Sequence, residues 1–202
     1  MIQFLRSFLS LSVFYSFFGW LIGGSSCRTE FVHKYVSPKP GDKILDIGCG
    51  PGDIVPYLPD VEYIGFDASL KYIKTAQAKY GHLGQFYCQK VSRTNFNNDS
   101  DFDIVLAVGI VHHLNDLEAL ELLALAKDVL KPGGKLVTFD GVFLKNQSPI
   151  ARYIIAQDRG KFVRHKEEYF SLTSKVFSDI KVSIRHDLLR IPYTHLILEC
   201  TK

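Results

Sequence analysis

The chain has 202 residues, of which 47% are hydrophobic and 22% are charged, and its formal net charge is +3. This length and composition predict a single domain over residues 1–202 with a buried core, and they exclude a fibrous or fully disordered protein. The small net charge and the scattered basic residues do not favour a nucleic-acid partner.

The number and spacing of the cysteines indicate the redox compartment of the protein. The four cysteines stand far apart and form no CxxC pair, at Cys27, Cys49, Cys88 and Cys200. This spacing favours reduced thiols over a disulfide framework or a zinc site. We therefore expect a reducing, cytoplasmic location.

The chain opens on an uncharged stretch, Ser7 to Ser26, that is about as long as a membrane span. Its apolar bulk, interrupted by serines and a Gly-Gly pair, favours a helix packed over a ligand cleft. Membrane contact through residues 7–26 and a secretion signal are the alternatives, although Arg6 alone is a weak basic region for a signal. We assign residues 1–40 to an N-terminal helical lid.

From residue 43 short apolar runs alternate with helical patterns, which indicates a parallel sheet. Five strands are expected at residues 43–48, 61–66, 84–89, 101–109 and 134–140. A mostly helical stretch over 148–177 and two further strands, at 179–189 and 193–201, complete the chain.

Two helices between the strands have clear signals. Ser69 is a plausible N-cap for a helix that ends at Gly81. A single apolar stripe before the sequence KPGG marks the other helix, with Ala119, Leu122, Leu123, Ala126 and Leu130.

The sequence ILDIGCGPGD, at residues 44–53, places three glycines where the first strand is expected to turn into a helix. Ligands bind at this carboxyl edge of a doubly wound sheet. Gly48, Gly50 and Gly52 permit positive φ and close approach of a ligand, and a helix start would add free N–H groups. A purely structural turn needs fewer glycines, so the pattern favours a binding loop.

The glycine spacing separates two cofactor classes. A dinucleotide fingerprint is GxGxxG, whereas this turn is GxGxG, and Asp53 lies where a pyrophosphate would have to sit. S-adenosylmethionine has no phosphate, and its methionine part carries an ammonium and a carboxylate. Asp46, just upstream of the glycines, suits the ammonium.

The motif ILDIGCGPG resembles the first motif of the class I S-adenosylmethionine-dependent methyltransferases, in particular the small-molecule type 11 and type 12 group. YIGFDAS, FDIVLAVGIVHHL and LKPGGKLVTFD resemble further motifs of this family, in the family order. The resemblance implies an α/β fold: a doubly wound, seven-stranded, mostly parallel sheet with a C-terminal antiparallel hairpin. It also implies a cofactor-binding core over 41–141, substrate-side elements over 142–202, and S-adenosylmethionine as cofactor with S-adenosylhomocysteine as product.

Carried over by motif, the resemblance assigns roles to individual residues. The methionine part is expected beside Asp46, Gly48, Cys49 and Gly50, the ribose on Asp67, the adenine beside Ala68, and further cofactor contacts at Ala107 and Val108. Where many relatives have an acidic residue for the adenine amino group, this chain has Lys90, which cannot accept that bond. Adenine recognition is therefore expected from backbone groups near Val91 or from a neighbouring side chain.

The chemistry asks mainly for alignment, because the sulfonium already activates the methyl group. His112 and His113 follow the fourth strand and are expected to face different ways. His113 is the candidate base or substrate contact, and a structural role in the loop is the alternative. We expect no metal, since the pair lacks a matching carboxylate or cysteine spacing.

These features predict methyl transfer to a small-molecule or lipid-precursor acceptor, without nucleic acid; the oligomeric state is unassigned. Aromatic and basic residues of the last third are candidate acceptor contacts or ordinary surface residues: Tyr153, Arg159, Arg164, Tyr169, Arg190 and Tyr193. A non-catalytic S-adenosylmethionine-binding protein and a nicotinamide-dependent oxidoreductase are the alternative functions.

Overall fold

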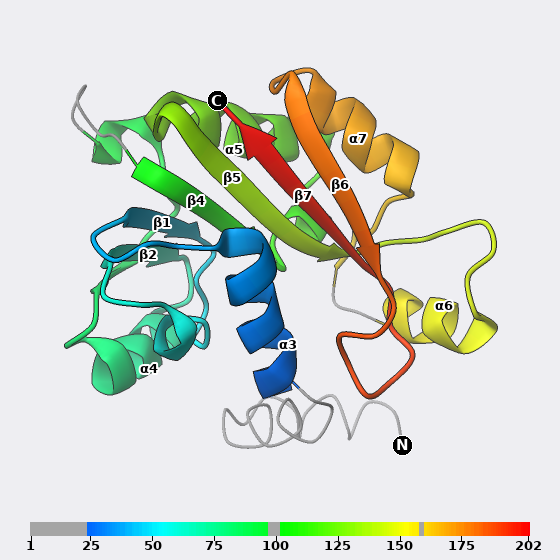
Figure 1. The fold of residues 1–202 in the computed structure, drawn as a ribbon, viewed down its shortest axis with the longest axis horizontal. Coiled ribbons are helices and arrows are strands. Elements are labelled where there is room, and N and C mark those ends of the chain that lie inside the picture. The colour runs from blue at the N-terminus through cyan, green and yellow to red at the C-terminus, as the bar shows by residue number, and fades with distance from the viewer. Residues whose placement is uncertain (1–23, 97–101, 158–159) are drawn as a thin grey trace.

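The computed structural model of the chain describes residues 24–96, 102–157 and 160–202. Its centre is a seven-stranded sheet of order β3-β2-β1-β4-β5-β7-β6 (Figure 1). The strands are β1 (Lys43–Ile47), β2 (Glu62–Asp67), β3 (Gln85–Cys88), β4 (Phe102–Val108), β5 (Leu130–Gly141), β6 (Asp179–Arg185) and β7 (His195–Thr201). The first five pair in parallel, and β7 runs antiparallel to both β5 and β6. The order reverses between β1 and β4, which makes their carboxyl ends the ligand edge of such a sheet.

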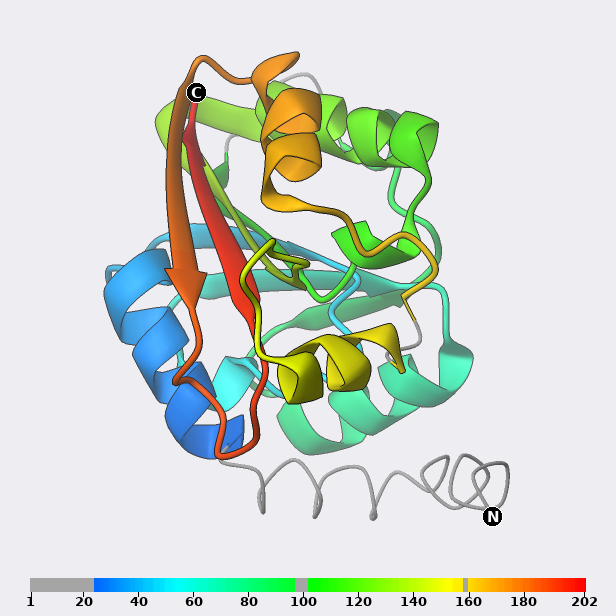
Figure 2. The same cartoon turned by 90° about the vertical axis from the view of Figure 1, so that its right-hand side faces the viewer.

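Helices cover both faces of the sheet. They are α3 (Gly24–Phe31), α4 (Leu70–Tyr80), α5 (Asp116–Val129), α6 (Pro149–Ala156) and α7 (Lys166–Ser174). Shorter helical turns are η1 (Val32–Val36), η2 (Val55–Tyr57), η3 (Arg93–Asn95) and η4 (Val111–His113). Figure 2 shows α5 and α7 on one face and α3 and α4 on the other. The buried apolar residues form two clusters, one beneath each pair of helices.

The expected fold class is confirmed, and so are its local signals. Each of the first four strands lies within about two residues of its expected range, whereas β5 begins at Leu130 rather than at Gly134. The Ser69 hydroxyl accepts from the Tyr72 N–H at 3.4 Å and caps α4. The expected apolar stripe of α5 is buried throughout. The spacing of the apolar residues therefore predicted which side of α5 packs against the sheet.

The helix expected directly after the glycines is a wrong prediction. The chain forms only the 3₁₀ turn η2 before it enters β2. Pro59 follows this turn and lacks the N–H that a continuing helix would need, and Leu58 before it is extended at ψ 148°. The turn is therefore followed by a short connection with no α-helical N-terminus.

The mostly helical stretch expected over 148–177 contains two helices, α6 and α7. Between them, residues 160–165 include a turn and end in a bridge between Phe143 and His165. This connection lies against η4, where the Phe162 N–H donates to the His112 carbonyl at 2.9 Å.

The described part of the chain begins at residue 24, inside the predicted lid. Of residues 7–26 only 24–26 are described, and they belong to α3; the rest of that prediction lies outside the described residues. Arg185 of β6 holds this part of the chain, since it pairs with Glu30 at 2.6 Å and donates to the Tyr35 hydroxyl at 2.9 Å. Within residues 24–96, 102–157 and 160–202, none of the helices combines the length and the apolar character needed to cross a membrane.

The two faces of α5 give a matched test of the core. Leu123 is 2% exposed and Leu117 is 68% exposed on the same helix. We expect Leu123→Ala to lower the free energy of unfolding by about 2–5 kcal/mol, because it leaves a cavity beneath the sheet. Leu117→Ala should change it by less than about 0.5 kcal/mol. Urea denaturation of both variants measures the difference, and equal losses would contradict this packing.

Candidate functional site

The glycine turn at the end of β1 has an unusual backbone. Gly48, Gly50 and Gly52 adopt φ of 77°, 54° and 77°, a region that disfavours any side chain. A Cβ on Gly48 would also lie 2.7 Å from the Ile110 side chain. The N–H groups of Gly48 and Cys49 both donate to the Phe66 carbonyl, at 2.8 and 3.0 Å. These bonds fold the turn over the end of β2.

Asp67, the last residue of β2, is held by this turn. Its Oδ2 accepts from the Gly50 N–H at 3.0 Å and its Oδ1 from the Ser69 N–H at 2.7 Å. The carboxylate is half-buried, and each oxygen retains capacity for a second donor. Two hydroxyls of a ribose are donors of that kind.

Asp46 on β1 is a buried acid, only 2% exposed. Its Oδ2 accepts from the Tyr63 hydroxyl at 2.7 Å, while its Oδ1 has no hydrogen-bond partner within the described part of the chain. Burial, opposed in part by the Tyr63 bond and reinforced by the negative charge of Asp67, raises its pKa to about 7. A buried oxygen without a donor fits a cationic ligand group such as an ammonium.

A cation contacts Asp53 at the end of the same turn. The Arg28 Nη2 of α3 is 3.2 Å from Asp53 Oδ2, with the side chains 32% and 23% exposed. This ion pair partly neutralises Asp53, so the carboxylate would repel a pyrophosphate less strongly than the sequence alone suggests. The GxGxG spacing still separates this turn from a dinucleotide fingerprint.

The side chain of Cys49 does not point toward a ligand. It packs under the turn, so that a Cβ on Gly65 would lie 2.8 Å from its sulfur. Burial raises the pKa of its thiol well above the ordinary range. Cys49 can therefore contribute backbone groups to a ligand at this turn, but no thiolate.

The remaining expected cofactor residues differ in exposure. Ala68 is exposed, and its carbonyl accepts from the Cys88 thiol at 3.8 Å. Val91 and Val108 are half-buried, whereas the side chain of Ala107 is fully buried in the core. Ala107 can thus present only its backbone. The structure brings Ala68 and the end of β3 together beside Asp67, as strand pairing between Asp67 and Cys88 requires.

The two histidines after β4 differ in exposure, but the expectation that they face different ways is wrong, because their ring centroids lie only 4.3 Å apart. His113 is exposed, whereas His112 is 6% exposed and its Nδ1 lies 2.7 Å from Asp140 Oδ1. The same oxygen accepts from the His112 N–H at 3.1 Å. The sequence analysis did not single out Asp140. Its place at the end of the expected fifth strand was the only sequence feature that pointed to it. The pair fixes η4 to the end of β5 and leaves His113 on the surface.

Arg164 is a second anchor for this loop rather than an exposed acceptor contact. It is 7% exposed, and its guanidinium donates to Asp116 Oδ1 at 2.8 and 3.1 Å. It also donates to the carbonyls of Val111, Leu114 and Phe162 at 2.7–3.2 Å. With five hydrogen bonds the guanidinium is saturated. It ties the segment before α7 to the loop after β4.

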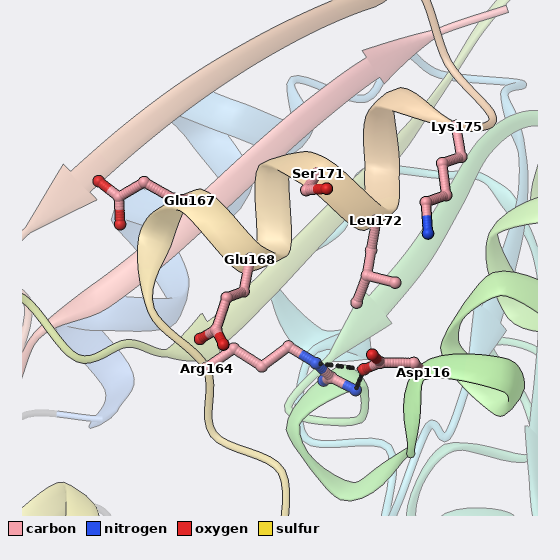
Figure 3. Close-up of a pocket in the computed structure, with 7 residues that line it drawn as sticks. All are labelled: Asp116, Arg164, Glu167, Glu168, Ser171, Leu172 and Lys175. Carbon is pink, nitrogen blue, oxygen red and sulfur yellow. Dashed lines mark hydrogen bonds and ion pairs between the residues drawn. The ribbon is translucent and has the colours of Figure 1, made fainter.

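A shallow cavity of about 300 Å³ lies beside this anchor, between α7 and the start of α5 (Figure 3). Its lining residues are Asp116, Arg164, Glu167, Glu168, Ser171, Leu172 and Lys175. Figure 3 shows the Arg164 guanidinium directed at Asp116, and the lining combines acidic, basic and apolar side chains. It lies among elements of the α5 and α7 face, whereas the glycine turn packs with α3 and α4.

Residues 44–134, which contain the glycine turn and Asp67, match a family described as "Methyltransferase domain". Over these residues the chain is similar to a methyltransferase domain. This match supports the resemblance to S-adenosylmethionine-dependent methyltransferases that the motifs indicate.

Individual relatives point the same way. The chain is 33% identical over 123 residues to phosphoethanolamine N-methyltransferase 1 of Arabidopsis thaliana, covering 58% of this chain and 24% of the relative. It is 29% identical over 108 residues to a probable tRNA methyltransferase 9B of Bos taurus, covering 50% and 22%. The chain spans less than half the length of the curated relatives it matches.

A solved structure shares the fold. Phosphoethanolamine N-methyltransferase 2 of Haemonchus contortus, in complex with phosphomonomethylethanolamine and S-adenosylhomocysteine, superimposes with a TM-score of 0.67 at 17% identity. The match covers 87% of this chain and 52% of that chain. At this identity the likeness shows a shared fold and nothing further.

The raised pKa of Asp46 predicts a pH-dependent stability. The folded protein holds this proton up to about pH 7, whereas the unfolded chain releases it near the ordinary value of 3.8. Between these values the folded state binds more protons, so its stability falls as pH rises. Asp46→Asn removes this loss and still offers an oxygen to Tyr63.

We expect thermal melts to show that the stability of Asp46→Asn relative to wild type increases from pH 4 to pH 8. The difference should reach up to a few kcal/mol at pH 8. Asp60→Asn, at an exposed position, controls for the loss of one negative charge. A stability difference between Asp46→Asn and wild type that is constant over this pH range would contradict the assignment.

Proposed function

We propose that this domain transfers a methyl group from S-adenosylmethionine to a small-molecule or lipid-precursor acceptor. The observation that carries the proposal is the glycine turn between two carboxylates. Among the described residues, one oxygen of the buried Asp46 has no hydrogen-bond partner, and Asp67 is fixed by two backbone N–H groups. This arrangement complements an ammonium at one end and a ribose diol at the other.

Each element of the turn has a role in this proposal. Asp46 binds the ammonium of the methionine part, and Gly48 and Gly50 let that part lie against the backbone. Asp67 accepts from both ribose hydroxyls. The backbone near Ala68 and Val91 is assigned to the adenine. Ala68 follows Asp67 directly, and Cys88, which pairs with Asp67, lies three residues before Val91.

The bound cofactor supplies an activated methyl group, so the protein's part is to align the acceptor and remove its proton. His113 is the proposed base or acceptor contact. It is exposed after β4, while His112, Asp140 and Arg164 hold its loop in place. An imidazole is suited to proton transfer near neutral pH.

The proposal extends to the whole chain. Residues 1–40 are the proposed lid. Support comes from the described part of this segment, residues 24–40, in which Cys27 belongs to the same buried cluster as Cys49 and Ile54. Residues 142–202 lie on the acceptor side. The relatives named for phosphoethanolamine support a small-molecule acceptor, although another relative is named as a probable tRNA methyltransferase. The four unpaired cysteines support a cytoplasmic location.

A binding protein without catalysis is the alternative, because the cofactor contacts do not themselves require turnover. The two functions differ in one measurable respect. A methyltransferase releases S-adenosylhomocysteine when an acceptor is present, whereas a binding protein returns S-adenosylmethionine unchanged.

Cofactor class and the role of Asp67 are tested together by calorimetry. Wild type should bind S-adenosylhomocysteine and show no heat with NAD. Asp67→Ala should weaken binding about 10- to 150-fold, the loss of a hydrogen bond to a charged group. Asp60→Ala, an exposed carboxylate on the connection before β2, serves as control. Tight NAD binding without S-adenosylhomocysteine binding would overturn the proposal.

The role of His113 is tested with an accepted substrate, beginning with phosphoethanolamine. His113→Ala should slow release of S-adenosylhomocysteine by roughly 10²- to 10⁴-fold, the range for loss of a general base. Its affinity for the cofactor should stay near that of wild type. His82→Ala, at another exposed histidine, should leave the rate unchanged. If His113→Ala lost cofactor binding or stability instead, the residue would belong to the scaffold.

A further inference from the structure

The methionine part of the proposed cofactor has two charges, and the turn accounts for only one of them. Asp46 complements the ammonium, but the carboxylate needs donors or a cation. A helix start after the glycines would supply N–H groups. This chain has only the 3₁₀ turn η2 there, and the Gly50 N–H is already bonded to Asp67. A cation from another element would complement the carboxylate more strongly than the remaining N–H groups of this turn.

Helix α3 supplies a cation at this place. Cys27 of α3 packs in one cluster with Cys49 and Ile54, which flank the turn. The next residue, Arg28, reaches Asp53 at the end of the turn, 3.2 Å away. We infer that Arg28 binds the carboxylate of the cofactor's methionine part and so selects cofactors that carry it. This inference rests on the proposed function.

The charge and geometry of Arg28 suit this role. Within the described part of the chain its guanidinium uses only Nη2, toward Asp53. The planar fork can hold Asp53 on one side and a second carboxylate on its remaining donors. Asp53 then orients Arg28 beside the turn. The zwitterion of the methionine part would lie between a buried anion, Asp46, and this cation.

The alternative is that the ion pair only fastens α3 to the turn. Both side chains are partly exposed, and such pairs contribute little to stability. Moreover, α3 and η1 are held independently, because Arg185 contacts Glu30 and Tyr35. Variants of Arg28 should therefore fold, and ligand binding can be measured on them.

The experiment compares the affinities of three proteins for two ligands, measured by calorimetry on the full chain. The ligands are S-adenosylhomocysteine and 5′-S-(3-aminopropyl)-5′-thioadenosine, the same molecule without its carboxylate. The proteins are wild type, Arg28→Met, which keeps an apolar stem, and Lys34→Met. Lys34 is an exposed cation on η1 and controls for the loss of one positive charge.

We expect wild type and Lys34→Met to bind S-adenosylhomocysteine about 10- to 100-fold more tightly than the amine, the scale of a charge-assisted hydrogen bond. In Arg28→Met this ratio should fall to near one, through weaker binding of S-adenosylhomocysteine alone. A ratio unchanged in Arg28→Met, or an equal loss for both ligands, overturns the inference and leaves the proposed function standing. If wild type binds neither ligand, the proposed function itself fails.

Discussion

The site depends on the junction between β1 and β2. The strands pair in parallel from Lys43 with Glu62 to Ile47 with Phe66, and the Phe66 carbonyl then accepts two N–H groups of the glycine turn. Because the pairing continues to the ends of both strands, Asp46 and Asp67 reach the same edge of the sheet. Only glycines tolerate the positive φ that this fold-back demands. The turn thus determines the positions of both carboxylates at once.

The buried acid carries a cost for the folded protein. An aspartate with a pKa near 7 destabilises the ligand-free fold when it ionises at neutral pH. A bound ammonium would offset that cost, and the binding of a cation and the ionisation of Asp46 would then favour each other. Violations of ordinary burial rules are expected at sites of function. The free oxygen of Asp46 is such a violation.

The opposite side of the edge is organised by long-range polar contacts. His112 is fixed by Asp140, and Arg164 ties residues 160–165 to the loop after β4 through Asp116 and three carbonyls. A loop fixed by buried hydrogen bonds loses little entropy when a ligand binds. The exposed His113 therefore lies on a rigid support. The apolar packing of α5 and α7 against the sheet supports these contacts from below.

The sequence by itself determined the strand positions, the α5 stripe, the Ser69 cap and the glycine turn, because these depend on local periodicity and on backbone freedom; the complete seven-stranded sheet was implied by the resemblance to the family. It also placed Asp46 and Asp67 at strand ends, where parallel pairing brings them together. Only the tertiary structure decided that a 3₁₀ turn replaces the helix after the glycines, and that Arg28 meets Asp53, His112 meets Asp140 and Arg164 meets Asp116. These partners are 25, 28 and 48 residues apart. No local pattern encodes such contacts, since they form only when packing of the two faces brings distant segments into register.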